Sequence, residues 1–256
     1  MIEAVFIGAG NLATSLATEL NRHNVRVSQI YSRTEESAGE LAGKLGCAWT
    51  TSTSEIRKDA DWYIFLVKDA ALPGLIRQIE PNEGLWLHTA GSIPIDVFEG
   101  YIKRYGVLYP LQTFSKSRTV DFSVIPFLIE ANNESDVRLL TETVATITSD
   151  IRFLTSEQRK QVHLAAVFAC NFTNHLYHLA YKLLKEKNIN PEILLPLIDE
   201  TVAKVHAMTP EEAQTGPAVR YDENIINNHL DALEDEDVKA LYRLLSQSIY
   251  KVKHTK

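Results

Sequence analysis

The chain has 256 residues, 45% of them apolar, which is enough for one large domain or two smaller ones with filled cores. Its formal net charge of -7 argues against a nucleic-acid partner, because binding many phosphates needs a basic surface, but it leaves room for one bound nucleotide. No basic leader precedes the first apolar segment and the longest apolar run, LAAVFAC, is too short to cross a bilayer, so we expect a cytoplasmic protein without membrane association.

Residues 1–154 are predicted to form a doubly wound α/β domain. Strand-like runs alternate with helical ones as far as residue 90, and such alternation gives parallel βαβ units with helices on both faces of a sheet. The strand-like runs are EAVFIG, VRVSQIYS, CAWT, DWYIFLV and GLWLHT. Two more runs, VLYPLQT and SVIPFLIEA, extend to residue 131, and a helix and a short strand complete the segment. The expected fold is α/β, with a Rossmann-type, mostly parallel sheet.

Residues 155–256 have no convincing strand and are predicted to form an all-α C-terminal domain. Thr155 and Gln158 fit a capping box at the start of a long helix that continues to about residue 187. Between residues 162 and 170 this helix is apolar nearly all round, so we expect both of its sides to be buried. A small domain supplies too little cover for that, and we predict a homodimer interface. Cys170, inside this run, is expected to be buried, and with Cys47 it gives no disulfide framework.

Three further helices are expected in the C-terminal domain. The first covers residues 191–208, with a kink at Pro196, because proline cannot donate the helical hydrogen bond. The other two lie within residues 222–252, and the acidic run 234–237 is expected to cap the last of them. In the segment TGPAVRYD, Thr215 and Gly216 suggest a tight turn, and Arg220 and Asp222 could pair with each other or with a substrate carboxylate.

A glycine-rich turn joins the first predicted strand to the first predicted helix. It fits the G-x-G-x-x-A pattern of dinucleotide-binding folds and consists of Gly8, Ala9, Gly10, Asn11, Leu12 and Ala13. Gly8 permits the tight turn, Gly10 has no Cβ and lets a pyrophosphate approach the backbone, and Ala13 lets helix and strand pack closely. The free N–H groups of the helix N-terminus attract the phosphates. The pattern predicts a dinucleotide site at residues 8–12; the alternative is a purely structural turn.

The end of the second predicted strand indicates which dinucleotide binds. NAD enzymes place Asp or Glu there, about 20 residues past the motif, to bind the ribose 2′-hydroxyl. This chain has Ser32, Arg33 and Thr34 instead, and the first carboxylate is Glu35. Arg33 can hold a 2′-phosphate with its planar guanidinium, and the two hydroxyls can donate to it. We therefore predict NADP as the cofactor; the alternative is that Arg33 is a solvated loop cation.

The carboxyl ends of two later strands supply more candidates, because ligands of open α/β sheets bind at that edge. The predicted cofactor contacts there are Val67, Lys68, Thr89, Ala90 and Gly91. His88 is a candidate catalytic residue, and the segment YPLQTF adds Gln112 and Thr113 near the same edge. Lys68 is nearly as well explained as a surface lysine.

Several segments together resemble a family of proposed NADP oxidoreductases. They are FIGAGNLATSL, YSRT, LHTAGSIP, YPLQTFS, HLAAVFACNFTNHL and TGPAVRYD, and the resemblance covers nearly the whole chain. Members join a Rossmann-like N-terminal domain to an uncharacterised helical C-terminal domain. The N-terminal half more distantly resembles pyrroline-5-carboxylate reductase, 6-phosphogluconate and β-hydroxyacid dehydrogenases, and deazaflavin-dependent NADP reductase. The resemblance implies a hydride-transfer fold and dimerisation through the helical domains, and it brings no substrate.

One departure from the related enzymes bears on the chemistry. β-Hydroxyacid dehydrogenases place a catalytic Lys four residues before an Asn on the long helix. Asn171 matches that Asn, but Val167 stands in the place of the Lys. Reduction of an imine needs less from the protein, because an iminium is already electrophilic and orientation supplies much of the rate.

The long helix carries polar residues inside its apolar stretch. On a regular helix His163, Asn171, Asn174 and His178 fall within roughly 80° of one another. They could line a substrate cleft between the domains, with His163, Asn171 and Asn174 as catalytic candidates and His163 as proton donor. The alternative is that they hydrogen-bond across helices in the core. His175 and His178 have a spacing that can bind metal, but no nearby carboxylate or thiol completes a site, so no metal is expected.

These observations favour an NADP-dependent oxidoreductase that transfers hydride between NADP(H) and a small carbonyl or imine compound in an interdomain cleft. A binding protein that senses NADP without turnover is the alternative that the missing Lys favours. Deazaflavin–NADP hydride exchange is a third possibility, with no residue of the sequence assigned to the deazaflavin.

Overall fold

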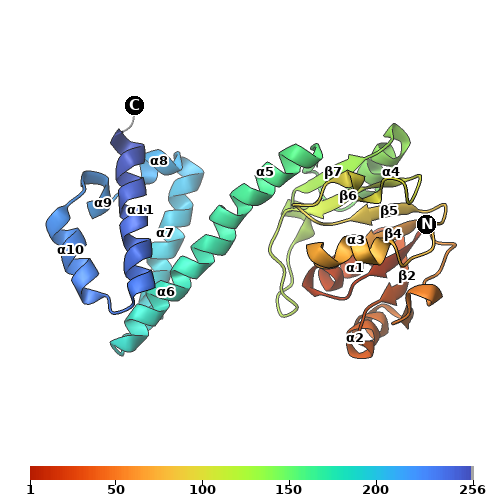
Figure 1. Ribbon diagram of the computed structural model, residues 1–256, viewed down its shortest axis with the longest axis horizontal. Helices are drawn as coiled ribbons and strands as arrows, with labels where there is room; N and C mark the ends of the chain where they lie inside the picture. Colours follow the sequence, from red (N-terminus) through yellow and green to blue (C-terminus); the bar gives the residue numbers. More distant parts are fainter. Residues whose placement is uncertain (255–256) are drawn as a thin grey trace. The chain divides into compact units, whose positions relative to one another are not determined.

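The computed structural model describes residues 1–254, and its contacts divide the chain into two compact units. The first unit comprises Met1–His175 and contains the sheet, and the second begins at Leu176 and is helical (Figure 1). Each unit is described by itself below.

The first unit is built on one sheet of eight strands in the order β3-β2-β1-β4-β5-β6-β7-β8. Six of them, β1 to β6, are parallel to one another, β7 runs antiparallel to β6, and β8 is parallel to β7. The strands are β1 (Ile2–Ile7), β2 (Val25–Tyr31), β3 (Ala48–Thr50), β4 (Trp62–Phe65), β5 (Leu85–His88), β6 (Tyr105–Pro110), β7 (Phe127–Ala131) and β8 (Ile151–Phe153). The predicted Rossmann-type, mostly parallel sheet is confirmed.

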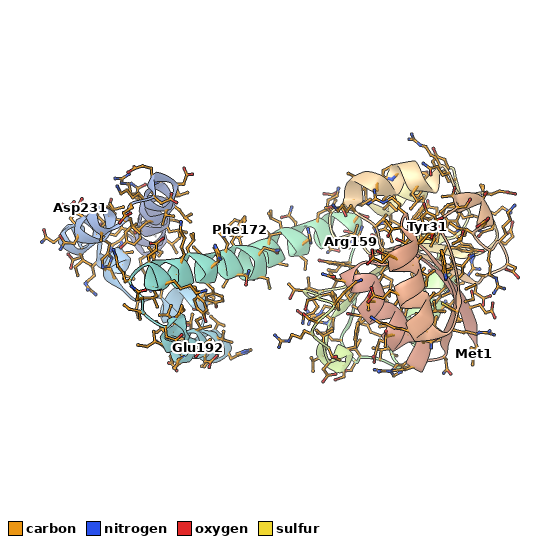
Figure 2. All side chains as sticks on the ribbon, turned by 90° about the horizontal axis from the view of Figure 1, so that it is seen from below. Met1, Tyr31, Arg159, Phe172, Glu192 and Asp231 are labelled. Atoms are coloured by element: carbon orange, nitrogen blue, oxygen red, sulfur yellow. The ribbon has the colours of Figure 1, made fainter. Side chains whose placement is uncertain are left out.

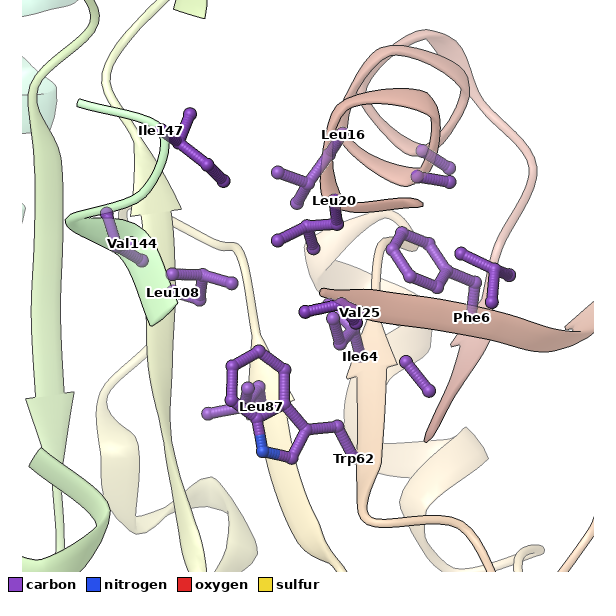
Figure 3. Packing of buried hydrophobic residues seen from close by; sticks show 14 of the residues in the cluster. Phe6, Leu16, Leu20, Val25, Trp62, Ile64, Leu87, Leu108, Val144 and Ile147 are labelled. Atoms are coloured by element: carbon purple, nitrogen blue, oxygen red, sulfur yellow. The ribbon is translucent and has the colours of Figure 1, made fainter. Parts of the chain in front are cut away.

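Helices cover both faces of this sheet, which explains why its central strands are continuous apolar runs. On one face lie α1 (Asn11–Arg22), α2 (Glu35–Leu45) and α4 (Glu134–Val144), whose apolar sides form one core cluster with the strands. Figure 3 shows this packing, with Leu16 and Leu20 of α1 above Phe6 and Ile64 of the sheet. The opposite face is covered by α3 (Leu72–Ile76) and a 3-10 turn, Ile95–Phe98, around a second cluster rich in aromatic rings.

The long predicted helix is present, but it is interrupted. It consists of α5 (Ser156–Ala166), a π-helical segment (Val167–Phe172) and α6 (Thr173–Glu186). The capping box at its start is confirmed: Thr155 accepts from the Gln158 N–H, and Gln158 accepts from the Thr155 N–H. Nothing in the apolar pattern indicated the π segment.

Inside residues 1–254 the remaining α-helices are α7 (Leu195–Ala207), preceded by a 3-10 turn (Pro191–Leu194), α8 (Pro210–Ala213), α9 (Pro217–Arg220), α10 (Glu223–Ala232) and α11 (Glu236–His254). The predicted kink at Pro196 is wrong, because Pro196 lies in the first turn of α7, where the missing N–H costs nothing. Asp235 accepts from the N–H groups of Asp237 and Val238, so the predicted acidic cap of α11 is confirmed. Asp222 caps α10 by accepting from the Ile225 N–H through Oδ1, and its predicted pairing with Arg220 or a substrate stays a prediction.

The apolar run of the long helix is not buried within the single chain, so its expected burial still depends on the predicted homodimer interface. Leu164, Phe168 and Phe172 are each more than half exposed, and Cys170 is exposed as well.

A buried ion pair ties the start of α5 to the sheet. The Arg159 side chain is 1% exposed and pairs with Glu130 of β7, while its other terminal nitrogen donates to the Ile93 carbonyl at 2.6 Å. Ser156 donates to the same carboxylate at 2.8 Å and accepts from the Ile95 N–H at 2.9 Å. Figure 2 shows Arg159 at the end of α5 nearest the sheet. The predicted division at residue 154 marks the change to helices, whereas the contacts assign the helix as far as His175 to the first unit.

Replacing Glu130 by Ala leaves the Arg159 charge buried without a counterion. We expect Glu130→Ala to lower the free energy of unfolding by about 3 kcal/mol, as for other broken buried pairs. Urea unfolding measures this. The matched control is Glu134→Ala, which breaks an ion pair with Arg138 whose side chains are both more than 70% exposed. An equal effect of both substitutions would contradict the anchoring role of Glu130.

Candidate functional site

The turn between β1 and α1 brings the end of β1 against the end of β4, and Gly8 makes this possible. Gly8 has a φ of +127°, and a Cβ built there would lie 2.2 Å from the carbonyl oxygen of Leu66. Its N–H donates to Tyr31 at 2.8 Å, and the Leu66 N–H donates to Ile7 at 2.8 Å. Gly8 is therefore required by the packing of the protein itself.

Gly10 differs from Gly8, because a Cβ at Gly10 would meet no protein atom within 4 Å. Gly10 is the N-cap of α1, no side chain caps that helix, and its first turn has no acidic residue. The open space at Gly10 and the N-terminus of α1 is therefore suited to an anion that approaches the backbone. This is the place where the motif predicts a pyrophosphate.

The other residues of the turn have distinct positions. Ala13 is fully buried in the core, as its predicted packing role requires, and Ala9 is 8% exposed. Leu12 is half-buried and packs against the same core. Asn11 donates through Nδ2 to the carbonyl oxygen of Phe114, 3.1 Å away, so it holds a segment that follows β6.

The residues after β2 offer donors that the protein does not use. Arg33 is exposed and makes no hydrogen bond or ion pair with any residue from 1 to 254. The Thr34 side chain does not cap α2, although Thr34 is its N-cap residue. Ser32 uses its N–H to reach the Thr50 carbonyl and leaves its hydroxyl available. One guanidinium and two hydroxyls are thus grouped where the sequence predicts a 2′-phosphate.

The loops after β4 and β5 lie at the same edge of the sheet. Val67 is half-buried against the second core cluster, whereas Lys68 is exposed. Thr89 is buried and donates its hydroxyl to the Phe65 carbonyl, which joins the two strand ends. Ala90 is half-buried beside it, and its N–H is held by His88.

His88 is fully buried, and its Nδ1 accepts from the Ala90 N–H at 3.1 Å. Burial lowers its pKa to about 3, with a smaller contribution from the nearby Arg159 charge. The side chain therefore stays neutral and has no exposed surface to offer a substrate. We replace the predicted catalytic role of His88 by a positioning one: it fixes the loop that follows β5.

His163 reaches the sheet edge from α5. A Cβ at Gly91 would lie 2.5 Å from the His163 ring, so the absence of a side chain at Gly91 admits the imidazole. The Nδ1 of His163 lies 3.0 Å from the hydroxyl of Tyr109 in β6. Burial raises the pKa of Tyr109, so the phenol keeps its proton. This places the predicted proton donor beside the loop after β5.

Tyr109 was missed by the sequence interpretation. A tyrosine in an apolar strand is typical of a core residue, and only the strand register shows that Tyr109 lies near the carboxyl end of β6. The signal available in the sequence was its position one residue before Pro110, at the end of the predicted strand.

The predicted polar stripe on the long helix is not continuous. The π segment takes more residues for each turn than an α-helix, so the spacing from His163 to Asn174 no longer defines one face. Asn171 lies inside that segment, and Asn171 and Asn174 are both exposed. Neither is brought to Gly91 by any described contact, and His178 belongs to the second unit.

Across residues 1–254, no three His, Cys, Asp or Glu side chains are grouped so that they could hold a metal ion. The helices in the same range also lack the length and apolarity that crossing a bilayer requires.

Two family descriptions match separate parts of the chain. NADP oxidoreductase, coenzyme F420-dependent, matches residues 3–88, and a domain of unknown function, DUF2520, matches residues 125–249. The crystal structure of a proposed NADP oxidoreductase from Bacteroides fragilis is 51% identical, with 98% of each chain covered and a TM-score of 0.92. The chain belongs to this oxidoreductase family. The resemblance drawn from the sequence motifs is confirmed.

Two enzymes of lower identity share the fold. A pyrroline-5-carboxylate reductase from Streptococcus pyogenes is 13% identical, with 100% of this chain and 99% of that one covered and a TM-score of 0.64. A reductive aminase from Aspergillus terreus, solved with NADPH and ethyl levulinate, is 14% identical, with 99% and 95% covered and a TM-score of 0.73. No curated protein sequence matches the chain significantly. The chain thus has the fold of NADP-binding oxidoreductases.

The buried neutral His88 predicts a pH dependence of stability. Its pKa is about 3 in the folded protein and about 6.5 in an unfolded chain, so below pH 6.5 the unfolded state binds more protons. The free energy of unfolding should therefore fall as the pH drops from 6.5 towards 3, by up to about 1.4 kcal/mol for each pH unit.

Urea unfolding between pH 4 and pH 7.5 checks this expectation. His88→Gln should remove that part of the slope, because glutamine can still accept from Ala90 and does not titrate. His206→Gln, at an exposed position, is the control and should keep the wild-type slope. A slope unchanged in His88→Gln would show that other groups dominate.

Proposed function

We propose that the protein is an NADP-dependent oxidoreductase. The observation that carries this proposal is the open space at Gly10, at the N-terminus of α1, in a chain whose fold is that of NADP-binding oxidoreductases. A side chain at Gly10 would fill the space in which the backbone can receive a pyrophosphate. Residues 8–12 would hold the pyrophosphate, and Val67, Lys68, Thr89, Ala90 and Gly91 would lie along the remainder of the dinucleotide.

Arg33 supports NADP over NAD as the cofactor. It has no partner among the residues described, and it stands with two free hydroxyls where NAD enzymes have a carboxylate. A guanidinium without a counterion is suited to bind a phosphate, because it can donate two parallel hydrogen bonds to the phosphate oxygens.

His163 is the residue we assign to proton transfer. NADPH, when bound, supplies a hydride to an electrophilic carbon. Tyr109 keeps its proton and can donate it to Nδ1 of His163, so that Nε2 carries the proton of the neutral imidazole. As Nε2 gives this proton to a carbonyl oxygen or an imine nitrogen, Nδ1 takes the proton of Tyr109, so the imidazole stays neutral, and solvent then returns a proton to the Tyr109–His163 pair. We therefore propose a small carbonyl or imine compound as the substrate class.

A sensor that binds NADP(H) without turnover is the second candidate. It is favoured by the lack of a lysine between Lys160 and Lys182 on the long helix and by the exposed Asn171. Tight NADPH binding with no oxidation across a panel of cyclic imines and 2-oxo acids would support the sensor. Turnover of one compound that is lost in His163→Phe would support the enzyme.

We also propose that the protein is a homodimer through the long helix. Leu164, Phe168 and Phe172 are all exposed in the single chain, and the rings of Phe168 and Phe172 lie 5.0 Å apart, so the helix carries an exposed apolar stripe over these residues. Such an apolar stripe is complementary to a second copy of itself, since a two-fold axis brings the same surface from both chains together.

Titration with NADPH and NADH, followed by nicotinamide fluorescence, tests the cofactor proposal. Wild type should bind NADPH more tightly than NADH. Arg33→Ala should weaken NADPH by about 1.5–3 kcal/mol, as lost charged hydrogen bonds do, and change NADH little. Gly10→Ala should keep the wild-type melting temperature and should no longer bind NADPH or NADH. Equally weak binding of both nucleotides by wild type would leave the glycine turn with a structural role only.

Light scattering after size-exclusion chromatography tests the dimer. Wild type should have twice the chain mass of 28.8 kDa. Replacing both Phe168 and Phe172 by Asp should give the single-chain mass, because two buried carboxylates would oppose association. Val124→Asp, at a 71% exposed position on the first unit, is the control and should stay dimeric. A monomeric wild type at micromolar concentration would exclude the proposal.

A further inference from the structure

The segment between β6 and β7 is an ordered hairpin that lies against the side of the sheet carrying α1 and α2. We define the β6–β7 hairpin as residues 111–121 (Figure 1). Phe114 packs against the core cluster of that face, and its ring stacks on Phe122 at 5.8 Å. A bridge between Ser115 and Arg118 closes a tight turn, so Lys116 stands at the tip.

This hairpin contacts the glycine turn, to which we assign the pyrophosphate, and α2, the helix that follows the residues to which we assign the 2′-phosphate. Its Phe114 carbonyl accepts from Asn11, the first residue of α1 and a neighbour of Gly10. Two residues further on, Lys116 pairs at 2.8 Å with Glu40 of α2, the helix that starts directly after Arg33.

The contact between Lys116 and Glu40 is not needed to satisfy Glu40. Lys44, four residues along the same helix, pairs with that carboxylate at 2.8 Å as well. Together the two lysines lower the pKa of Glu40 to about 2, with Lys116 the larger cause. Both Lys116 and Glu40 are more than 40% exposed, and an exposed ion pair contributes little to stability. Lys116 can therefore leave Glu40 at small cost.

The distance that Lys116 must cover is short. Glu40 is five residues beyond the first residue of α2, which is about 8 Å along the helix axis from the end where Arg33 stands. Lysine carries its charge on a flexible four-carbon chain, and here that chain is mounted on a hairpin tip.

We propose that Lys116 is a second cation for the 2′-phosphate of NADP(H), and that Glu40 holds its ammonium group nearby while no dinucleotide is bound. This inference rests on the proposed function. It assigns cofactor discrimination to two cations, one fixed at the end of β2 and one delivered by the β6–β7 hairpin. The Glu40 carboxylate pairs with the Lys116 ammonium group until the 2′-phosphate of a bound NADP(H) takes its place as the partner of Lys116.

Titration of Lys116→Ala and Lys44→Ala with NADPH and NADH tests the proposal. Lys116→Ala should lower the affinity for NADPH about tenfold and the affinity for NADH less than about twofold, since the two nucleotides differ only in the 2′-phosphate. Lys44→Ala removes the same charge and the other partner of Glu40, and it should change neither affinity more than about twofold. Equal losses in the two variants, or no loss in Lys116→Ala, would overturn the proposal.

A double-mutant cycle with Glu40→Gln separates release of Lys116 from the general effect of removing a negative charge. Glu40→Gln should strengthen NADPH binding in the wild-type background and have a smaller effect in Lys116→Ala. An equal effect in both backgrounds would overturn the role of Glu40 as the holding group. Hydrogen exchange of residues 114–118 should slow when NADPH binds and be unchanged by NADH.

The outcome also distinguishes this inference from the proposed function. If Arg33→Ala selectively loses NADPH and Lys116→Ala binds like wild type, the role of Lys116 is rejected and the cofactor proposal stands. If wild type binds neither nucleotide, both are rejected.

Discussion

The buried ion pair between Arg159 and Glu130 is the constraint on which the candidate site depends. It holds the start of α5 against the sheet, and the geometry of that helix then determines that His163 arrives at Gly91. The same guanidinium lowers the pKa of His88 and opposes the rise in the pKa of Tyr109. One charge thus anchors a helix and helps to keep a structural histidine neutral. Breaking the pair would disturb the position of His163, the proposed proton donor, and would also lower the stability of the protein.

The two glycines of the first turn show how one motif combines two demands. At Gly8 the protein itself occupies the space that a side chain would need, through the carbonyl of Leu66. At Gly10 that space is left open at a helix N-terminus without a capping side chain. A motif match alone cannot tell these cases apart, because both are written as glycine. The surroundings of each Cβ position show which glycine serves the fold and which can serve a ligand.

The sequence was sufficient for features that depend on local pattern. Alternating apolar runs predicted the parallel sheet, and Thr155 with Gln158 predicted the start of α5. It was insufficient where a residue's role depends on long-range packing. His88 ends a buried strand at an edge where ligands bind, and only the covering of that edge by Arg159 and Phe98 makes it a core residue. Tyr109 was missed because its partner is 54 residues away, and the π segment because its residues are apolar like those of a regular helix.

The reversal of direction between β6 and β7 determines where the β6–β7 hairpin lies and where α5 begins. Because β7 is antiparallel to β6, their connection must turn back at the carboxyl end of β6, which is the edge where the glycine turn lies. A parallel neighbour would have required a crossover that leaves this edge. The reversal also makes β8 run away from the same edge, so α5 starts part-way along the sheet. The helix then runs back towards the carboxyl ends of β5 and β6. One antiparallel strand therefore brings two parts of the chain, the β6–β7 hairpin and α5, to the same edge of the sheet.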